Sequence, residues 1–509
     1  MTAGAAKREI LARFVALSGP VAVREIYARY GWDERWIKSR LTEWQRTGKL
    51  VRGRFRAEQT EPEWCSRRIA EVARRRALAA LRRQIEAVEL PVFAELVQRW
   101  QHVDPRDRLS GAEGVATAIR QLYGVARSPK SWERDYLRAR VAAYDPAWLS
   151  PTLSSGETVW VGESNAESNA QATILARLRF FSRGTGALWL GDDAPAETAT
   201  RLSANGLLVL EVIEKEGAPF TTDVEAVTGL TSLAVREALR ELVAVGLVTN
   251  DTAEAMRQVI RWRPLQTKEG PDPTRWLPAD YSPSSNRRVV QRRPNLRRLP
   301  KWRRPDRPGG STSNWGGRWT LVHRLGVLGR MAGEEERAAR IARYWLDRYG
   351  IVAREMWRRE RPRVSWRSIY MELKRFEFRG EVRRGYFVRG LSGAQFATAT
   401  AVELIRSIAG EEESSKPYVV LAASDPANIY NLPMDLADRD QLSRPRGAGA
   451  LLVTRGGRVA LAVEGRGRRV VAAEWMDRHE ITRAKEHLAE HLRGERSARY
   501  LMLPDIDRA

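Results

Sequence analysis

The 509-residue sequence is poor in cysteine and in long apolar runs, and each scarcity excludes a class of protein. One cysteine, Cys65, excludes a disulfide within the chain and a zinc site built from several thiolates. No apolar run approaches the roughly 18 to 20 residues of a membrane-spanning helix. The first residues lack the apolar core of a signal peptide. These absences predict a soluble protein of a reducing compartment, the cytoplasm, with no membrane partner.

Signatures of enzymatic nucleotide hydrolysis are also missing. The phosphate-binding pattern G-x-x-x-x-G-K-[ST] does not occur, and "TGKL" at 47–50 is interpreted as a turn. A nucleophile elbow is absent as well. We therefore expect no ATPase or helicase activity and no cofactor from this chain alone.

Histidine is scarce, yet "HLAEH" at 487–491 matches the H-x-x-E-H pattern of one metalloprotease class. Few residues follow it to supply a third ligand, and predicted strands surround its helix. We interpret His487, Glu490 and His491 as polar surface residues of an amphipathic helix, and we predict no metal site.

Positive charge, in contrast, is abundant. The chain has 87 Lys and Arg residues against 63 Asp and Glu, a net charge of +24. Such an excess repels itself unless a polyanion offsets it, and nucleic acid is the first candidate. The 43% hydrophobic content and 18 tryptophans indicate a folded chain, and its length indicates several domains. A nucleoid-associated protein is the expected class.

Three segments share one order of elements: a helix, a Gly turn, a second helix and an Arg-rich strand pair, which is typical of a winged helix. In the first, Asp33 can cap a helix whose inward face carries Ile37, Leu41 and Trp44 at helical spacing. The corresponding inward residues are Val235, Leu239 and Leu242 in the second segment, and Ile369, Leu373 and Phe376 in the third. Similarity between "GKLVRGRF" and "GEVRRGYF" supports tandem units.

The predicted fold class is α+β, with tandem winged-helix domains and a C-terminal β-barrel-like module. Short strands separated by Gly turns predict that last module. The predicted domains are a winged helix at 1–58, a helical, winged-helix-like domain at 59–154, a β-rich segment at 155–200, a winged helix at 201–265, a basic linker at 266–315, a winged helix at 316–409 and the β module at 416–509.

A winged helix that binds DNA places its second helix in the major groove and its wing on phosphates. Exposed basic and polar residues at those positions are the predicted contacts: Arg35, Lys38, Ser39, Arg52, Arg54, Arg367, Lys374, Arg383 and Arg384. The second unit carries Glu237 and Glu241 on its helix and is the best candidate for a spacer. The alternative is that these winged helices bind protein and their charges are simply solvated.

The most basic stretch, 286–308, contains ten Lys or Arg residues and one Asp. Arg297, Arg298 and Arg303 represent it among the predicted nucleic-acid contacts. Its position between two winged-helix units makes it a connector, and its binding to phosphate would depend on salt but not on base sequence. The alternative is a solvated linker.

Candidate chemistry centres on "RWQHVDP" at 99–105. Gln101 and Asp104 could orient and activate a water for attack at a sugar carbon. The favoured alternative is a helix C-terminus held by polar side chains. Asp425, Asp505 and Asp507 are further carboxylates at strand or chain ends.

Several stretches together resemble the C-terminal region of bacterial large helicase-related (Lhr) proteins. "TEWQRTGKLVRGRF", "RWQHVDP", "GETVW", "RRGYFVRGLSGAQFA" and "LAASDPANIYN" occur in that family's order, whereas the helicase core is absent. The resemblance implies tandem winged helices with a β-barrel, similar to AlkZ-type DNA glycosylases, and self-association into tetramers.

The resemblance also implies uracil-DNA glycosylase activity with a catalytic Asp. That residue is not assigned among Asp104, Asp425, Asp505 and Asp507. AlkZ-type enzymes carry Gln-x-Gln or Gln-x-Asp, and the Gln-x-x-Asp spacing of Gln101 and Asp104 departs from both. Three hypotheses follow: a DNA-binding repair module acting with a helicase partner, a DNA glycosylase, and an oligomerising protein scaffold.

Overall fold

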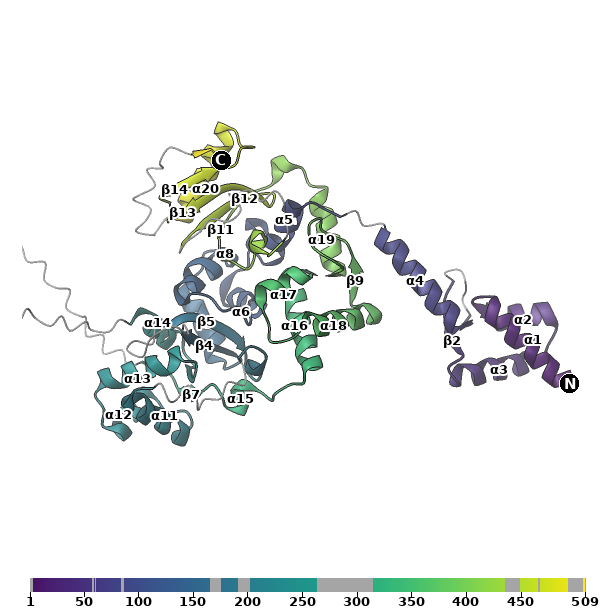
Figure 1. Ribbon diagram of the computed structural model, residues 1–509, viewed down its shortest axis with the longest axis horizontal. Coiled ribbons are helices and arrows are strands. Elements are labelled where there is room, and N and C mark those ends of the chain that lie inside the picture. Colours follow the sequence, from purple (N-terminus) through teal and green to yellow (C-terminus); the bar gives the residue numbers. More distant parts are fainter. Residues whose placement is uncertain are drawn as a thin grey trace, which may run out of the picture. The chain divides into compact units, whose positions relative to one another are not determined.

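A computed structural model describes residues 3–56, 59, 61–83, 87–164, 175–190, 202–262, 315–434, 449–465, 467–492 and 507–508 (Figure 1). Two compact units divide it: 1–87 with 384–387, and 88–383 with 388–509. The basic stretch, with Arg297, Arg298 and Arg303, lies outside the described residues, as does Asp505. None of the described helices is both apolar enough and long enough to span a bilayer.

The first unit is a winged helix. Asp33 caps its recognition helix by accepting a hydrogen bond from the Trp36 backbone N–H at 2.8 Å, and Ile37, Leu41 and Trp44 are buried, as predicted. Its three strands pair antiparallel in the order β1-β3-β2. The elements are α1 (Ala3–Leu17), β1 (Val21–Ala22), α2 (Val23–Tyr30), α3 (Glu34–Arg46), β2 (Leu50–Gly53), β3 (Glu63–Ser66) and α4 (Arg67–Arg83).

The second unit begins with short helices followed by one strand pair. β4 and β5 pair antiparallel, with Thr158 opposite Ser182. β5 ends at Ser182, because Gly184 adopts φ +78° and the chain turns into a 3-10 helix. The elements are α5 (Leu90–Trp100), η1 (Pro105–Asp107), α6 (Gly111–Gln121), α7 (Pro129–Ser131), η2 (Trp132–Leu137), α8 (Arg138–Arg140), η3 (Pro146–Trp148), α9 (Leu149–Ser154), β4 (Thr158–Ser164), β5 (Leu175–Ser182) and η4 (Gly186–Leu188).

The next winged helix closes its sheet with a strand from beyond the basic stretch. β6 pairs antiparallel with β7, so Thr249 lies opposite Thr320. The winged helix predicted at 316–409 includes β7, which instead pairs with a strand of the preceding winged helix. Trp319 secures the pairing: its indole is fully buried and donates to the Thr221 hydroxyl at 3.0 Å. The elements are α11 (Ala204–Glu216), α12 (Thr221–Thr228), α13 (Ser232–Ala244), β6 (Val248–Asn250), α14 (Ala253–Arg261), β7 (Trp319–Leu321) and α15 (Leu325–Leu328).

The last winged helix has its three strands in the order β8-β10-β9. Ile369, Leu373 and Phe376 of α18 are buried, and Val235, Leu239 and Leu242 of α13 are buried in the preceding winged helix, so both predicted inward faces are confirmed. The elements are α16 (Glu334–Tyr349), β8 (Ile351–Val352), α17 (Arg354–Glu360), α18 (Trp366–Arg379), β9 (Val382–Gly385), β10 (Gln395–Thr398) and α19 (Ala399–Ala409).

The C-terminal module is a five-stranded sheet in the order β11-β12-β13-β14-β15, with α20 packed against β11 and β13. Over the described residues the sheet is open, with β11 and β15 at its edges. The α+β class with winged helices is therefore confirmed, and barrel closure stays a prediction. The elements are η6 (Glu413–Ser415), β11 (Tyr418–Ala422), η7 (Ile429–Asn431), β12 (Leu451–Arg455), β13 (Arg458–Glu464), β14 (Arg469–Ala472), α20 (Arg478–His491) and β15 (Asp507–Arg508).

Candidate nucleic-acid interface

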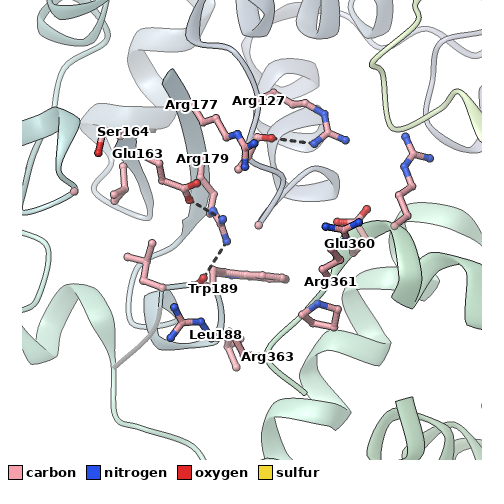
Figure 2. A pocket seen from close by; sticks show the side chains of 18 of the residues that line it. Arg127, Glu163, Ser164, Arg177, Arg179, Leu188, Trp189, Glu360, Arg361 and Arg363 are labelled. Carbon is pink, nitrogen blue, oxygen red and sulfur yellow. Dashed lines mark hydrogen bonds and ion pairs between the residues drawn. The ribbon is translucent and has the colours of Figure 1, made fainter. Parts of the chain in front are cut away.

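A cavity of about 870 Å³ in the second unit gathers an excess of arginine (Figure 2). Its lining includes residues from the chain after α6, β4, β5, the chain after β5, the end of α17 and the loop near residue 431. Seven arginines and two glutamates line it: Arg127, Arg177, Arg179, Arg358, Arg359, Arg361, Arg363, Glu163 and Glu360.

The pleat of β5 places two of these arginines on one face. Side chains alternate along a strand, so Arg177 and Arg179 share the cavity face while Leu178 and Phe180 are buried on the other. Arg179 forms an ion pair with Glu163 at 2.6 Å and donates to the Trp189 carbonyl at 3.0 Å. Arg177 is exposed.

The end of α17 turns two more arginines outward. Arg361 adopts the left-handed conformation, with φ 48°, and its N–H donates to the Trp357 carbonyl at 2.9 Å. This conformation costs a non-glycine residue about 1–2 kcal/mol, so a helix end under no other constraint would favour glycine here. The Trp357 indole donates to the Val364 carbonyl at 2.9 Å and fixes the loop. Arg361 and Arg363 are exposed at this turn.

An aromatic ring lies among these cations. Trp189 is half-buried, and its ring packs against Gly124, where a Cβ would come within 2.4 Å of it, and against Tyr344 at 5.2 Å between centroids. In Figure 2 the ring projects toward Glu360 and Arg361. A rigidly held indole with cations around it is the arrangement on which a nucleic-acid base can stack.

Both carboxylates of the cavity are engaged by cations or hydroxyls. Glu360 accepts from the Tyr349 hydroxyl and pairs with Arg348 at 3.1 Å. Burial alone would raise the pKa of Glu360, but Arg348 and Arg359 lower it, whereas burial and the charge of Glu360 raise the pKa of Tyr349 to about 12. Glu360 is therefore anionic and Tyr349 neutral at pH 7, and the cavity keeps a positive excess.

The structure brings two predicted catalytic residues together through a third side chain. Arg140 donates to Gln101 Oε1 at 2.8 Å and to both Asp425 oxygens at 2.9 and 2.7 Å. All three residues are fully buried. Asp425 also accepts from the Ala427 N–H at 2.7 Å. This Gln101–Arg140–Asp425 clamp joins α5, α8 and the loop after β11.

Asp104 belongs to a different contact. It is buried, and both its oxygens accept from the Arg106 guanidinium, at 2.9 and 2.8 Å, while Oδ1 also accepts from the Arg106 N–H. Asp104 therefore caps the start of the η1 turn that follows α5. Asp507 lies in β15, opposite Val471 in a parallel pairing.

The clamp and the cavity share one loop. Arg359 donates to the carbonyls of Asp425 at 2.9 Å and Pro426 at 3.0 Å, and Arg127 donates to the Ser424 carbonyl at 3.1 Å. None of these cavity arginines was among the residues predicted from the sequence to contact nucleic acid. The signal available was "RRERPR" at 358–363, where four arginines surround a helix end.

The predicted winged-helix contacts lie at the surface of their own domains. Arg35, Lys38 and Ser39 of α3 are exposed, and Arg52 places its guanidinium 5.2 Å from the centre of the Trp64 ring. The remaining predicted residues are exposed, apart from half-buried Arg384: Arg54, Arg367, Lys374 and Arg383.

Comparison with known families accounts for two of these domains. Residues 88–178 and 331–417 each match a family model described as the large helicase-related protein, winged-helix domain. Both domains are Lhr-type winged helices. The predicted resemblance to the Lhr family is thus confirmed.

Whole-chain similarity agrees. The chain is 30% identical over 473 residues to the Lhr helicase/probable uracil glycosylase of Mycolicibacterium smegmatis, covering 91% of this chain and 29% of that protein. It is 28% identical over 444 residues to the Lhr helicase/uracil glycosylase of Escherichia coli, covering 82% and 27%. The chain thus spans less than a third of the length of these Lhr relatives.

A solved structure, Streptomyces sahachiroi DNA glycosylase AlkZ, matches with a TM-score of 0.41 and 14% identity, covering 83% of this chain and 100% of that one.

Proposed function

We propose that this chain is a DNA-binding module associated with DNA repair that acts with a helicase partner. One observation carries the proposal: seven arginines and a tryptophan converge on one cavity whose two carboxylates are already engaged. The names of the two Lhr relatives, helicase/probable uracil glycosylase and helicase/uracil glycosylase, support the choice of DNA.

Arginines of the cavity would contact phosphates, and its tryptophan would stack on a base. Arg177 and Arg361 are exposed at the cavity and can each donate to phosphate oxygens. The Trp189 ring can stack on a base, which tolerates any sequence because every base has a flat face. We therefore propose salt-dependent binding with little preference for sequence. The exposed residues of α3 and α18 add contacts of the winged-helix kind.

A paired substitution tests this cavity. We expect Arg177→Gln with Arg361→Gln to weaken binding of a fluorescent oligonucleotide and to lower the salt slope of the affinity by about 0.7 to 0.9 per lost phosphate contact. Arg406→Gln, an exposed arginine on α19, is the matched control. Affinity that ignores salt, or a double variant that binds like the control, contradicts the proposal.

A glycosylase is the second candidate. The chemistry would extrude a uracil or damaged base and hydrolyse its N-glycosidic bond with water activated by a carboxylate. Its support is the loop that Arg127 and Arg359 hold at the cavity, since Asp425 lies in that loop. Asp425 would have to leave Arg140 to act as a base.

Uracil excision is measured by incubating the chain with a uracil-containing oligonucleotide and cleaving with alkali. Gln101→Ala, Asp104→Asn, Asp425→Asn and Asp507→Asn are compared, each with its thermal unfolding curve to separate lost chemistry from lost folding. A folded variant that loses excision identifies the carboxylate. Activity retained in all four removes these positions from consideration.

Three finer predictions also belong to this proposal: a barrel-like C-terminal module, a homo-tetramer and a place at the nucleoid. Light scattering on the purified chain measures the second directly. A monomer at micromolar concentration would contradict it.

A further inference from the structure

A second cavity, of about 680 Å³, lies between the η1 and α8 segments on one side and α20 with β11 on the other. The chemistry-bearing residues that line it are Arg108, Arg138, Tyr144, Tyr418, His487 and His491. It is separate from the arginine-rich cavity described above, and no residue lines both.

Two arginines line this cavity without an ion pair. Arg108 and Arg138 are exposed, and neither forms an ion pair with another residue in the described part of the chain. Burial lowers the pKa of the Arg108 guanidinium, against the opposing charges of Asp104 and Glu490. Asp135, the nearby acidic residue on η2, is held by the Arg134 guanidinium at 2.7 Å through both oxygens. Glu490 on α20 is the one carboxylate in the lining.

The positive charges of Arg108 and Arg138 also act on His491. Burial lowers the pKa of its imidazole, and the charges of Arg108 and Arg138 lower it further, against an opposing effect of Asp135. Three groups able to carry positive charge thus converge on one space. An anion placed among them would relieve the repulsion and accept hydrogen bonds from two guanidinium forks.

The aromatic residues of the cavity are already covered. Tyr418 lies 5.4 Å from the His487 ring, and the Arg455 and Arg483 guanidiniums lie 5.5 and 5.9 Å from its centre. Tyr144 donates its hydroxyl to Glu133 at 2.9 Å. A ligand here therefore meets cations rather than an open ring face, which favours recognition of charge over recognition of a base.

We propose that this cavity binds a phosphate group through Arg108 and Arg138, with His491 as a third donor when it is protonated. The η1 turn that Asp104 caps ends directly before Arg108, so Asp104 positions that arginine. The phosphate can belong to a nucleic-acid backbone or to a free nucleotide, since both present the same oxygens. The proposal rests on this cavity alone and not on the proposed function.

The test follows the pKa of His491 by NMR in the full chain with selectively labelled histidines. Inorganic phosphate, a nucleoside monophosphate and an oligonucleotide are the three probes, and His479, exposed at the start of α20, is the control signal. We expect a bound phosphate to raise the pKa of His491 and to leave that of His479 unchanged. A response to the oligonucleotide alone assigns the site to a nucleic-acid strand, and a response to the small probes assigns it to a free phosphate ester.

Substitutions separate this role from a structural one. Arg138→Gln, at an exposed position, should raise the pKa of His491 without ligand and abolish the response to phosphate. Glu490→Gln removes the opposing charge and should tighten phosphate binding about threefold to tenfold. The Arg177→Gln and Arg361→Gln pair should leave all these responses intact. A His491 pKa unchanged by every probe, or an Arg138→Gln variant that responds like the original, overturns the proposal.

Discussion

Arg140 joins two parts of the second unit that are far apart in the sequence, through the hydrogen bonds of its guanidinium group. It bonds Gln101 in the chain after α5 and Asp425 in the loop after β11, and all three are withdrawn from water. A charge at such a depth is tolerated because a bidentate carboxylate compensates it. Removing one partner leaves the other charged and buried.

We expect Arg140→Met to lower the free energy of unfolding by about 3–5 kcal/mol, because Asp425 would remain buried without its counterion. Urea unfolding followed by circular dichroism measures the change. The control is Arg120→Met, whose ion pair with Glu113 lies at the surface and should contribute less than about 1 kcal/mol. Equal losses in the two variants would contradict a structural role for the clamp.

Histidine burial predicts how stability depends on pH. Burial lowers the pKa of His323, so the folded chain binds a proton there at lower pH than the unfolded chain, whose histidines titrate near about 6.5. Stability should therefore fall as pH is lowered through that value. Melting temperatures between pH 7.5 and 5.5 should show a smaller decline for His323→Gln than for the original chain. An identical decline would remove His323 as a source.

The sequence predicts the role of a residue when that role depends on its neighbours along the chain. The inward faces of α3, α13 and α18 follow from helical spacing, and the Asp33 cap from its place before a helix, so the sequence predicts them. The partners of Arg140, Asp104 and Trp319 were not predictable, because each contact depends on a tertiary arrangement or on side-chain geometry. Gln101 and Asp425 were nominated separately, for chemistry, and their link through Arg140 had no sequence signal.

At the scale of elements, the turn between β12 and β13 packs directly against the backbone of α5. Gly457 has φ +73°, and a Cβ there would come within 1.9 Å of the Pro91 carbonyl oxygen and 2.5 Å of the Glu95 nitrogen. Glu95 itself pairs with Lys416 at 3.0 Å and with Arg106 at 2.7 Å. The close backbone contact of Gly457 with α5 thus lies beside the buried ion pairs of Glu95.

Gly457→Ala should destabilise the chain by more than the backbone cost of about 1–2 kcal/mol for a left-handed alanine, because α5 and the sheet must also separate. Gly393→Ala is the matched control, with φ +68° and nothing within 4 Å of its added Cβ. Thermal unfolding of both variants gives the comparison. A Gly457→Ala loss no larger than that of the control would show that the contact adapts at little cost.

Elements were predicted best where periodicity was strong and least well where the chain returns from afar. The short strands predicted for the C-terminal module are present up to residue 472. The pairing of β6 with β7 does not follow from any pattern, because a β-strand carries no mark of its partner when a long segment intervenes. The arginine-rich cavity was not predicted for the same reason, since segments far apart in the sequence build it.

For the whole molecule, the net charge of +24 favours binding to a polyanion that weakens as salt is added. We expect the logarithm of the DNA affinity to fall linearly with that of salt concentration, by about 0.9 per neutralised phosphate on duplex and about 0.7 on single strands. Neutralising the arginines of 286–308 should reduce this slope without changing base preference. Anisotropy titrations on unrelated oligonucleotides measure both quantities, and a change in base preference would instead indicate direct reading of bases.

The strand pairing across the basic stretch also has a consequence for biosynthesis. Thr320 must reach Thr249, so the ribosome completes this sheet only after the whole intervening segment has been translated. At a synthesis rate of about 5 to 20 residues per second, this delay is roughly 4 to 14 s. During that time β6 has no strand to pair with, and the site that Trp319 will fill is exposed to solvent. An unpaired strand edge is a hazard for misassembly. The nascent chain therefore has an interval in which chaperones, or a nucleic acid drawn to the emerging arginines, can influence how this domain matures.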